Sequence, residues 1–151
     1  MTDLAPLQNT PTREQIDALQ AELAKLPQAT LSLHHYFAQG LYARELQIPA
    51  GCALTGMVHK TEHLNILSLG TITVWTEDGM KTVSAPFTMV SRPGTKRVGF
   101  AHTDVVWTTI HATEERDIDK LEQELVEYEP SLIQYDRIEV TTPAPTLENQ
   151  P

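Results

Sequence analysis

The sequence predicts a mostly β domain, either a sandwich or a barrel, with one α-helix near each end. Short segments that alternate apolar and polar residues, or that are rich in β-branched residues, recur between residues 31 and 110, with turn signals every eight to twelve residues. Asp78-Gly79 marks a hairpin turn. Helical periodicity occurs only before and after this region. The predicted strands are 31–36, 41–48, 63–69, 71–75, 81–85, 87–90 and 105–110.

The first helix is predicted to begin at Thr12, because Thr12 and Gln15 have the spacing of a capping box. Pro27 is expected to end this helix. We expect it to pack on a sheet or on a second subunit, with residues 1–11 as a flexible arm. Its apolar stripe consists of Ile16, Leu19, Leu23 and Leu26.

A second helix is predicted over residues 114–129, with Thr113 as its cap and Pro130 after its end. Residues 132–140 are expected to form an edge strand or to contact a neighbour, and the proline-rich residues 141–151 a disordered tail. One domain would then span residues 12–140, with its barrel core at about 31–112. The apolar stripe of this helix consists of Ile118, Leu121, Leu125 and Tyr128.

The 151 residues suit one domain with a real core. The net charge of −9 opposes binding to nucleic acid, and no apolar run approaches the length of a membrane span. The first residues lack the basic and apolar regions of a signal peptide. The single cysteine, Cys52, cannot form an internal disulfide, which favours a reducing compartment. We therefore expect a cytoplasmic protein.

Three histidines indicate chemistry: His59, His63 and His102. On one straight strand His59 and His63 would lie about 13 Å apart, too far to share an ion. On a helix they would share a face, but the flanking glycines and β-rich sequence oppose a helix. We expect residues 60–62 to form a turn, so that the two imidazoles face each other across a hairpin, with His102 on a later strand. His34, His35 and His111 are interpreted as structural.

These segments resemble the cupin family, the small proteins built on a double-stranded β-helix. The first cupin motif is Gly, five residues, His-x-His, three or four residues, Glu, six residues, Gly. Gly70 matches its last glycine, His63 occupies the position of its Glu, and His59 that of its second His, while Met57 stands at the first. Residues 93–94 followed by His102 resemble a lengthened second motif.

The resemblance implies a cupin-like jelly-roll barrel over about residues 31–112 that holds a divalent metal ion, whether iron, manganese, zinc or nickel. Its ligands would be His59, His63 and His102, with Glu62 as the alternative to His63 if the register shifts by one residue. Such sets leave coordination positions open. Lys96 and Arg97 are candidates for binding an anionic group.

Two functions follow as hypotheses. In the first, the protein is a metal-dependent enzyme that acts on a small polar or anionic molecule. In the second, it is a non-catalytic cupin that binds a ligand or has a structural or host-modulating role, for example as a bacteriophage product. Because cupin-like barrels commonly pair, the resemblance also implies a homodimer.

Overall fold

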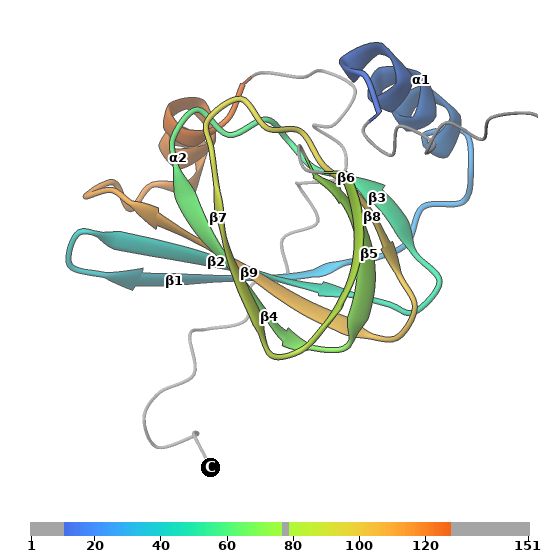
Figure 1. Cartoon of the computed structure of the whole chain (residues 1–151). Coiled ribbons are helices and arrows are strands. Elements are labelled where there is room, and N and C mark those ends of the chain that lie inside the picture. The colour runs from blue at the N-terminus through green and yellow to red at the C-terminus, as the bar shows by residue number, and fades with distance from the viewer. Residues whose placement is uncertain (1–10, 77–78, 128–151) are drawn as a thin grey trace, which may run out of the picture.

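The computed structural model describes residues 11–76 and 79–127, and these form a β-barrel flanked by two helices (Figure 1). The helices are α1 (Arg13–Leu23) and α2 (Ile118–Leu125). The strands are β1 (Ser32–Ala38), β2 (Leu41–Ile48), β3 (Ala53–Thr55), β4 (His63–Leu69), β5 (Thr71–Thr76), β6 (Gly79–Ser84), β7 (Phe87–Ser91), β8 (Val98–Ala101) and β9 (Val105–Ala112).

Two antiparallel sheets face each other across the core. One has five strands in the order β1-β2-β9-β4-β7, and the other has four in the order β3-β8-β5-β6. The pairs are nested, since β5 pairs with β6, β4 with β7, β3 with β8, and β2 with β9. This is the pattern of one long hairpin rolled up on itself, which is the jelly roll found in cupins. The predicted fold class is therefore confirmed.

The strands form where side chains alternate between the core and the outer face. In β4, His63, Asn65 and Leu67 are buried, whereas Leu64 is exposed. The main apolar core lies between the sheets and consists of Ile48, Leu67, Ile72, Val74, Ala101 and Val105. The sequence missed two short strands, β3 and β8, because three or four residues give too little alternation to recognise.

Helix α1 begins as predicted. Thr12 is its N-cap, the Thr12 hydroxyl accepts a hydrogen bond from the Gln15 backbone N–H, and the Gln15 side chain accepts one from the Thr12 backbone N–H. The helix ends at Leu23, before the predicted stop at Pro27. The Thr55 hydroxyl of β3 donates a hydrogen bond to the Gln20 side chain. In the part of the chain that is described, α1 therefore packs on the barrel.

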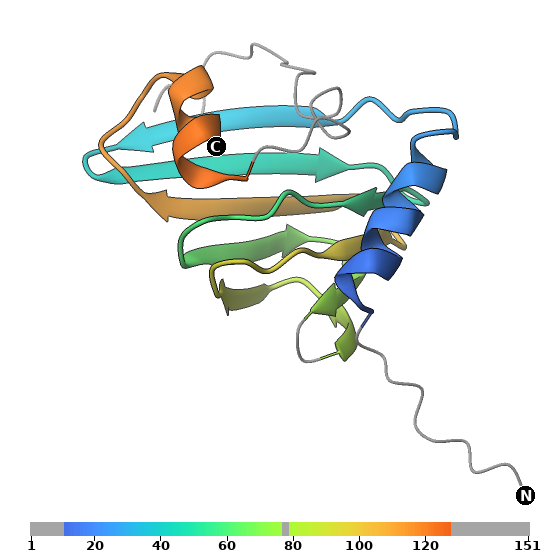
Figure 2. The same ribbon diagram turned by 90° about the horizontal axis from the view of Figure 1, so that it is seen from above.

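Helix α2 begins later than predicted. Its N-cap is Asp117, whose carboxylate accepts hydrogen bonds from the backbone N–H groups of Asp119 and Lys120. Thr113 is not the cap, because it directly follows strand β9 and the helix does not begin until Ile118. The predicted apolar stripe is confirmed for the part of it that is described: Leu121 and Leu125 are buried and pack with Tyr42 of β2, and Ile118 packs against them. Figure 2 shows α2 lying across the five-stranded sheet, at the opposite end from α1.

Some predictions fall outside the described residues: the arm before residue 11, Asp78 of the predicted turn, Tyr128, the segment 132–140 and the tail 141–151. The hairpin itself is present, since Thr76 pairs with Gly79. No helix in the described ranges has both the length and the apolar character needed to cross a membrane.

Candidate metal centre

Three imidazoles meet inside the barrel, near the end covered by α2. They belong to His59, His63 and His111, and one ring nitrogen of each lies within 4.8 Å of the corresponding nitrogens of the other two. The ring centroids are 4.2 Å apart for His59 and His63, 4.9 Å for His59 and His111, and 4.8 Å for His63 and His111.

Strand register brings two of these rings together. Strands β4 and β9 are antiparallel neighbours, with Leu64 opposite Ile110 and Asn65 opposite Thr109. One step further in the same register places His63 opposite His111. Both side chains are buried, His63 at 4% and His111 at 2% exposure, so both point into the barrel. His63 and His111 are far apart in the sequence, but this register places their side chains next to each other.

His59 comes from the segment before β4 rather than from a strand. It forms an isolated bridge with Val126, just after α2. The Lys60 N–H donates to the Leu125 carbonyl oxygen at 2.7 Å, and the Gly94 N–H donates to the His59 carbonyl oxygen at 2.9 Å. The backbone of His59 is thus held from two sides. Residues 60–62 turn the chain as predicted, but His59 and His63 do not lie across a hairpin, because β4 pairs with β7 and β9.

The protonation state of His63 follows from its hydrogen bond. Its Nδ1 lies 2.9 Å from the Thr61 carbonyl oxygen, and a carbonyl can only accept, so Nδ1 carries the proton. In the neutral ring, Nε2 then has a free lone pair. That atom is buried and has no hydrogen-bond partner among the described residues. A backbone carbonyl that fixes the tautomer in this way is typical of histidines that bind metals.

All three rings are held neutral near pH 7. Burial, with smaller contributions from the neighbouring His63, His111, Arg44 and Arg97, lowers the pKa of His59 to about 2. Burial also lowers the pKa of His111 to about 4, with His63 and Arg44 contributing. The pKa of His63 is lowered by burial and by Arg97, although its bond to Thr61 opposes this shift. Neutral imidazole is the form that binds a metal ion.

The site fits a divalent metal ion. Buried polar atoms normally have hydrogen-bond partners, yet His59 Nδ1, His63 Nε2 and His111 Nδ1 have none within the described ranges. Two nitrogens bound to one zinc ion can be at most about 4.2 Å apart, so small ring rotations would bring the three into range. Three imidazoles suit zinc, iron, nickel or copper better than magnesium or calcium, which prefer oxygen ligands.

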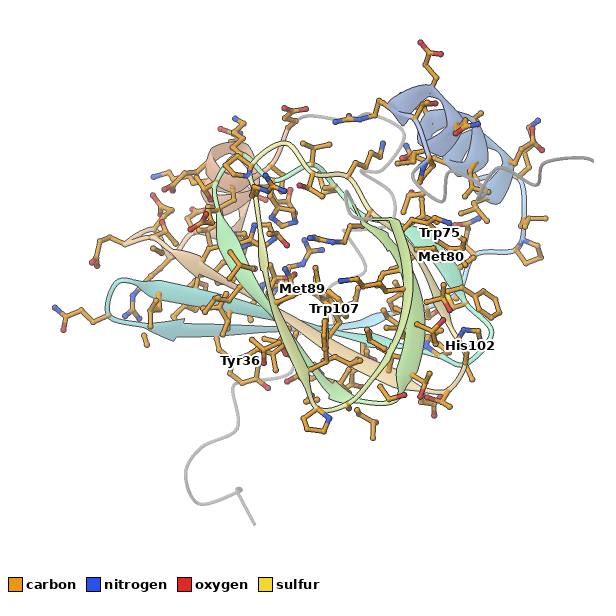
Figure 3. The ribbon with its side chains drawn as sticks, in the orientation of Figure 1. Tyr36, Trp75, Met80, Met89, His102 and Trp107 are labelled. Atoms are coloured by element: carbon orange, nitrogen blue, oxygen red, sulfur yellow. The ribbon has the colours of Figure 1, made fainter. Side chains whose placement is uncertain are left out.

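The structure does not bring His102 to this cluster, and this corrects the predicted ligand set. His102 follows β8 on the other sheet and is exposed, with its Nε2 2.6 Å from the Thr73 hydroxyl on the outer face of the barrel. Figure 3 shows it outside the four-stranded sheet, far from α2. His111, which the sequence suggested to be structural, occupies the third position instead.

The other predicted site residues differ in their distance from the histidine cluster and in their contacts. Glu62 is exposed and His63 is buried, so the register favours His63 over its alternative. The Lys96 ammonium lies 3.1 Å from Asp17 of α1, and its side chain is 1% exposed, so it ties α1 to the barrel rather than facing either described cavity. Arg97 lies close enough for its charge to lower the pKa values of His59 and His63.

A cavity of about 350 Å³ opens beside the cluster. It lies between α1, the segment 26–29 that follows it, strand β3 and the inner faces of β1 and β2. Its lining is mainly apolar. The charged or titratable side chains that line it are Arg44, Cys52 and His59. A second cavity, of about 20 Å³, adjoins His59 and His111 on the α2 side and is lined in part by His35, Arg44 and Glu122.

Tyr42 supports the cluster from the β2 side. Its ring stacks on His111 at a centroid distance of 6.3 Å, and its hydroxyl lies 2.6 Å from Nδ1 of His35. Tyr42 is buried in the second core cluster, together with Leu121 and Leu125 of α2. Packing of α2 therefore positions His59 through the backbone and His111 through Tyr42.

The fold and the cluster together define a cupin-type jelly roll with three inward-facing histidines. No protein-family model matches the sequence, and no curated protein matches it either. Solved cupin structures are similar in fold.

One similar structure is a cupin domain of an XRE-family transcriptional regulator from Enterobacter cloacae, with 6% identity over 58% of this chain and 100% of that chain, at a TM-score of 0.49. A second is an RmlC-like cupin from Shewanella frigidimarina, with 14% identity over 56% of this chain and 77% of that chain, at a TM-score of 0.48. A third is a cupin domain from Bordetella pertussis, with 14% identity over 58% and 98%, at a TM-score of 0.45.

Proposed function

We propose that this protein binds one divalent transition-metal ion through His59, His63 and His111 and uses the adjoining cavity to hold a small molecule beside it. The observation that carries this proposal is the convergence of three neutral imidazoles whose free ring nitrogens are buried and have no hydrogen-bond partner among the described residues. A purely structural cluster would be expected to satisfy those atoms.

The arrangement supports a role beyond structural metal binding. Three protein ligands leave at least one coordination position open, whereas structural zinc sites are closed by four. His59 also lines the large cavity, so a molecule in that cavity would lie next to the ion. When bound, the ion would supply Lewis acidity to that molecule. The residues of this chain would fix its position and limit access of water.

Elemental analysis of the protein, purified without a polyhistidine tag, tests this proposal. We expect about one equivalent of transition metal per chain, lost by dialysis against a strong chelator and restored on reloading. The variants His59→Ala and His111→Ala should lose the ion, because two imidazoles alone bind far more weakly.

His102→Ala is the matched control, since His102 is exposed and its ring bonds to the Thr73 hydroxyl on the outer face of the barrel. It should retain the ion. Loss of metal in His102→Ala with retention in His111→Ala would refute the proposed ligand set. A folded wild-type protein that takes up no transition metal would refute the metal site itself.

A non-catalytic role and an enzymatic one differ in a simple readout. If the protein is an enzyme, loaded protein should convert a bound small molecule, and His59→Ala should abolish conversion. If it is a ligand-binding protein, loaded protein should bind the molecule and release it unchanged.

A further inference from the structure

The large cavity beside the metal centre presents mostly hydrocarbon to a ligand. Its volume of about 350 Å³ lies within the usual range for small-molecule sites. The apolar side chains that line it include Leu23, Leu31, Leu33, Leu46, Leu54 and Met57. Water in such a space has few hydrogen-bond partners, whereas a hydrocarbon gains free energy over all the apolar surface that it covers.

The polar side chains of this lining already interact within the protein. The Thr55 hydroxyl donates a hydrogen bond to the Gln20 side chain, and the Gln28 amide donates to two backbone carbonyl oxygens near the end of α1. Arg44 also interacts with other groups of the chain. Burial raises the pKa of the Cys52 thiol, which is therefore neutral near pH 7. A ligand is thus not required to supply a charge, and an ionic group among the leucines would lose its hydration without compensation.

The cavity leads from the surface to the histidines. At its outer end it is lined by residues 26–29, which are exposed, with Leu26 at 57%. At its inner end it reaches His59 of the metal cluster. Between these ends, Leu33 of β1 lies opposite Leu46 of β2. A ligand that enters beside residues 26–29 therefore passes over leucines before it reaches the cluster.

The volume limits the size of the ligand. The space of about 350 Å³ corresponds to about 12 non-hydrogen atoms, counted at the space that a water molecule occupies in the liquid. A molecule of this size would be one chain or ring system of medium length.

We propose that the cavity binds a neutral, mainly hydrocarbon molecule of about 12 non-hydrogen atoms, beneath α1 and the segment 26–29, with its inner end beside His59. The position of that inner end next to an ion rests on the proposed function. The affinity for hydrocarbon does not, because the apolar lining is present without metal.

The first test is a series of straight-chain alcohols from butanol to tetradecanol, measured by calorimetry with metal-free protein. Affinity should rise about fourfold for each added methylene and level off near undecanol, where the cavity is full. Cys52, the single cysteine of the chain, lines the cavity and gives a second readout. Undecanol should slow its alkylation, and butanol at the same concentration should not.

The second test enlarges the cavity. Leu31 lines it and is partly buried, so Leu31→Ala should make room for about three more carbon atoms. In this variant the affinity should continue to rise up to tetradecanol. Leu64→Ala is the matched control, since Leu64 lies outside the cavity lining and is 42% exposed. Its series should level off at the same alcohol as the wild type.

The third test concerns charge and uses molecules that have the same polar group at both ends, so that one end must enter the cavity. Metal-free protein should bind 1,10-decanediol at least tenfold more tightly than decanedioate, because an entering carboxylate would lose its hydration among apolar side chains. Equal or tighter binding of decanedioate would show that the cavity selects anions, which overturns the neutral class of ligand.

The outcomes separate this inference from the metal site. Binding of undecanol to metal-free protein, with the expected chain-length dependence, supports the inference even if elemental analysis finds no ion. Affinity that does not change with chain length, together with unaltered alkylation of Cys52, overturns it even if one ion is bound per chain. An unchanged chain-length limit in Leu31→Ala overturns the location of the ligand in this cavity.

Discussion

The buried histidines should make the metal-free protein unusually sensitive to mild acid. Their folded-state pKa values, about 2 for His59 and about 4 for His111, lie below the ordinary value of 6.5. The unfolded chain therefore binds more protons than the folded one below about pH 6.5, and the free energy of unfolding falls as the pH falls. The loss from His111 is complete near pH 4, and that from His59 continues toward pH 2.

The expected magnitude is large. Between about pH 7 and about pH 5, each of these histidines should remove about 2 kcal/mol from the free energy of unfolding, or about 4 kcal/mol together. The total for a domain is about 5–15 kcal/mol, so this loss is a substantial part of the stability. Metal bound to the folded state should raise the free energy of unfolding by a similar amount throughout this range, so the chelator is needed to observe the effect in the less stable, metal-free protein.

Urea unfolding at several pH values, with a chelator present, measures this effect. The double variant His59→Asn/His111→Asn should lose most of the extra pH dependence, whereas His102→Asn should keep it, since His102 is exposed. The carboxylates of the chain contribute equally to all three proteins and cancel in the comparison. If the double variant and wild type lose the same free energy over this range, the neutral, buried state of these rings is wrong.

Other predictions concern the scaffold. Gly70 has φ +90°, and a Cβ there would lie 2.0 Å from the Asp104 carbonyl oxygen, whereas Gly51 has φ +80° and open space around it. Gly70→Ala should therefore lower the stability several times more than Gly51→Ala. Thermal unfolding of both variants measures this, and equal losses would show that the contact does not matter. Leu121→Ala should lower the free energy of unfolding by about 2–5 kcal/mol and also weaken metal binding, because α2 positions His59; unchanged metal affinity in this variant would refute that coupling. We also propose a homodimer, for which light scattering should give twice the chain mass of 16.9 kDa, and a single-chain mass would contradict it.

The sequence predicted the fold because the strands alternate strongly. The bounds 41–48 and 63–69 match β2 and β4, and the capping box located the start of α1 to the residue. Each of these elements is determined by local patterns that sequence alone contains.

The metal site was predicted only in part, because its third ligand depends on pairing between distant strands. His59 and His63 are close in sequence, and the turn between them is local. The choice between His102 and His111 depends on which face of which sheet each one occupies, and the spacing of the motif pointed to the wrong one. One signal was available: in Val105–His111 the inward positions alternate, which puts His111 on the same face as Val105 and Trp107.

The cavity and Arg44 could not be predicted in this way. Arg44 lies on a strand that reads as alternating and amphipathic, where a long cationic side chain usually points to solvent. Only the pairing of β1, β2 and β9 shows that it faces inward, and only the packing of α1 on β3 shows that a space remains beneath the helix.

The nested order of the strands also determines when during folding the site can form. The β5–β6 hairpin joins strands that are neighbours in the sequence, whereas the β2–β9 pair joins strands from opposite ends of the barrel sequence. Contacts between segments that are distant in sequence are expected to slow folding. Arg44 and His111 lie on that outermost pair. A nascent or partly assembled chain therefore lacks the complete centre, and uptake of metal would report that the roll has closed.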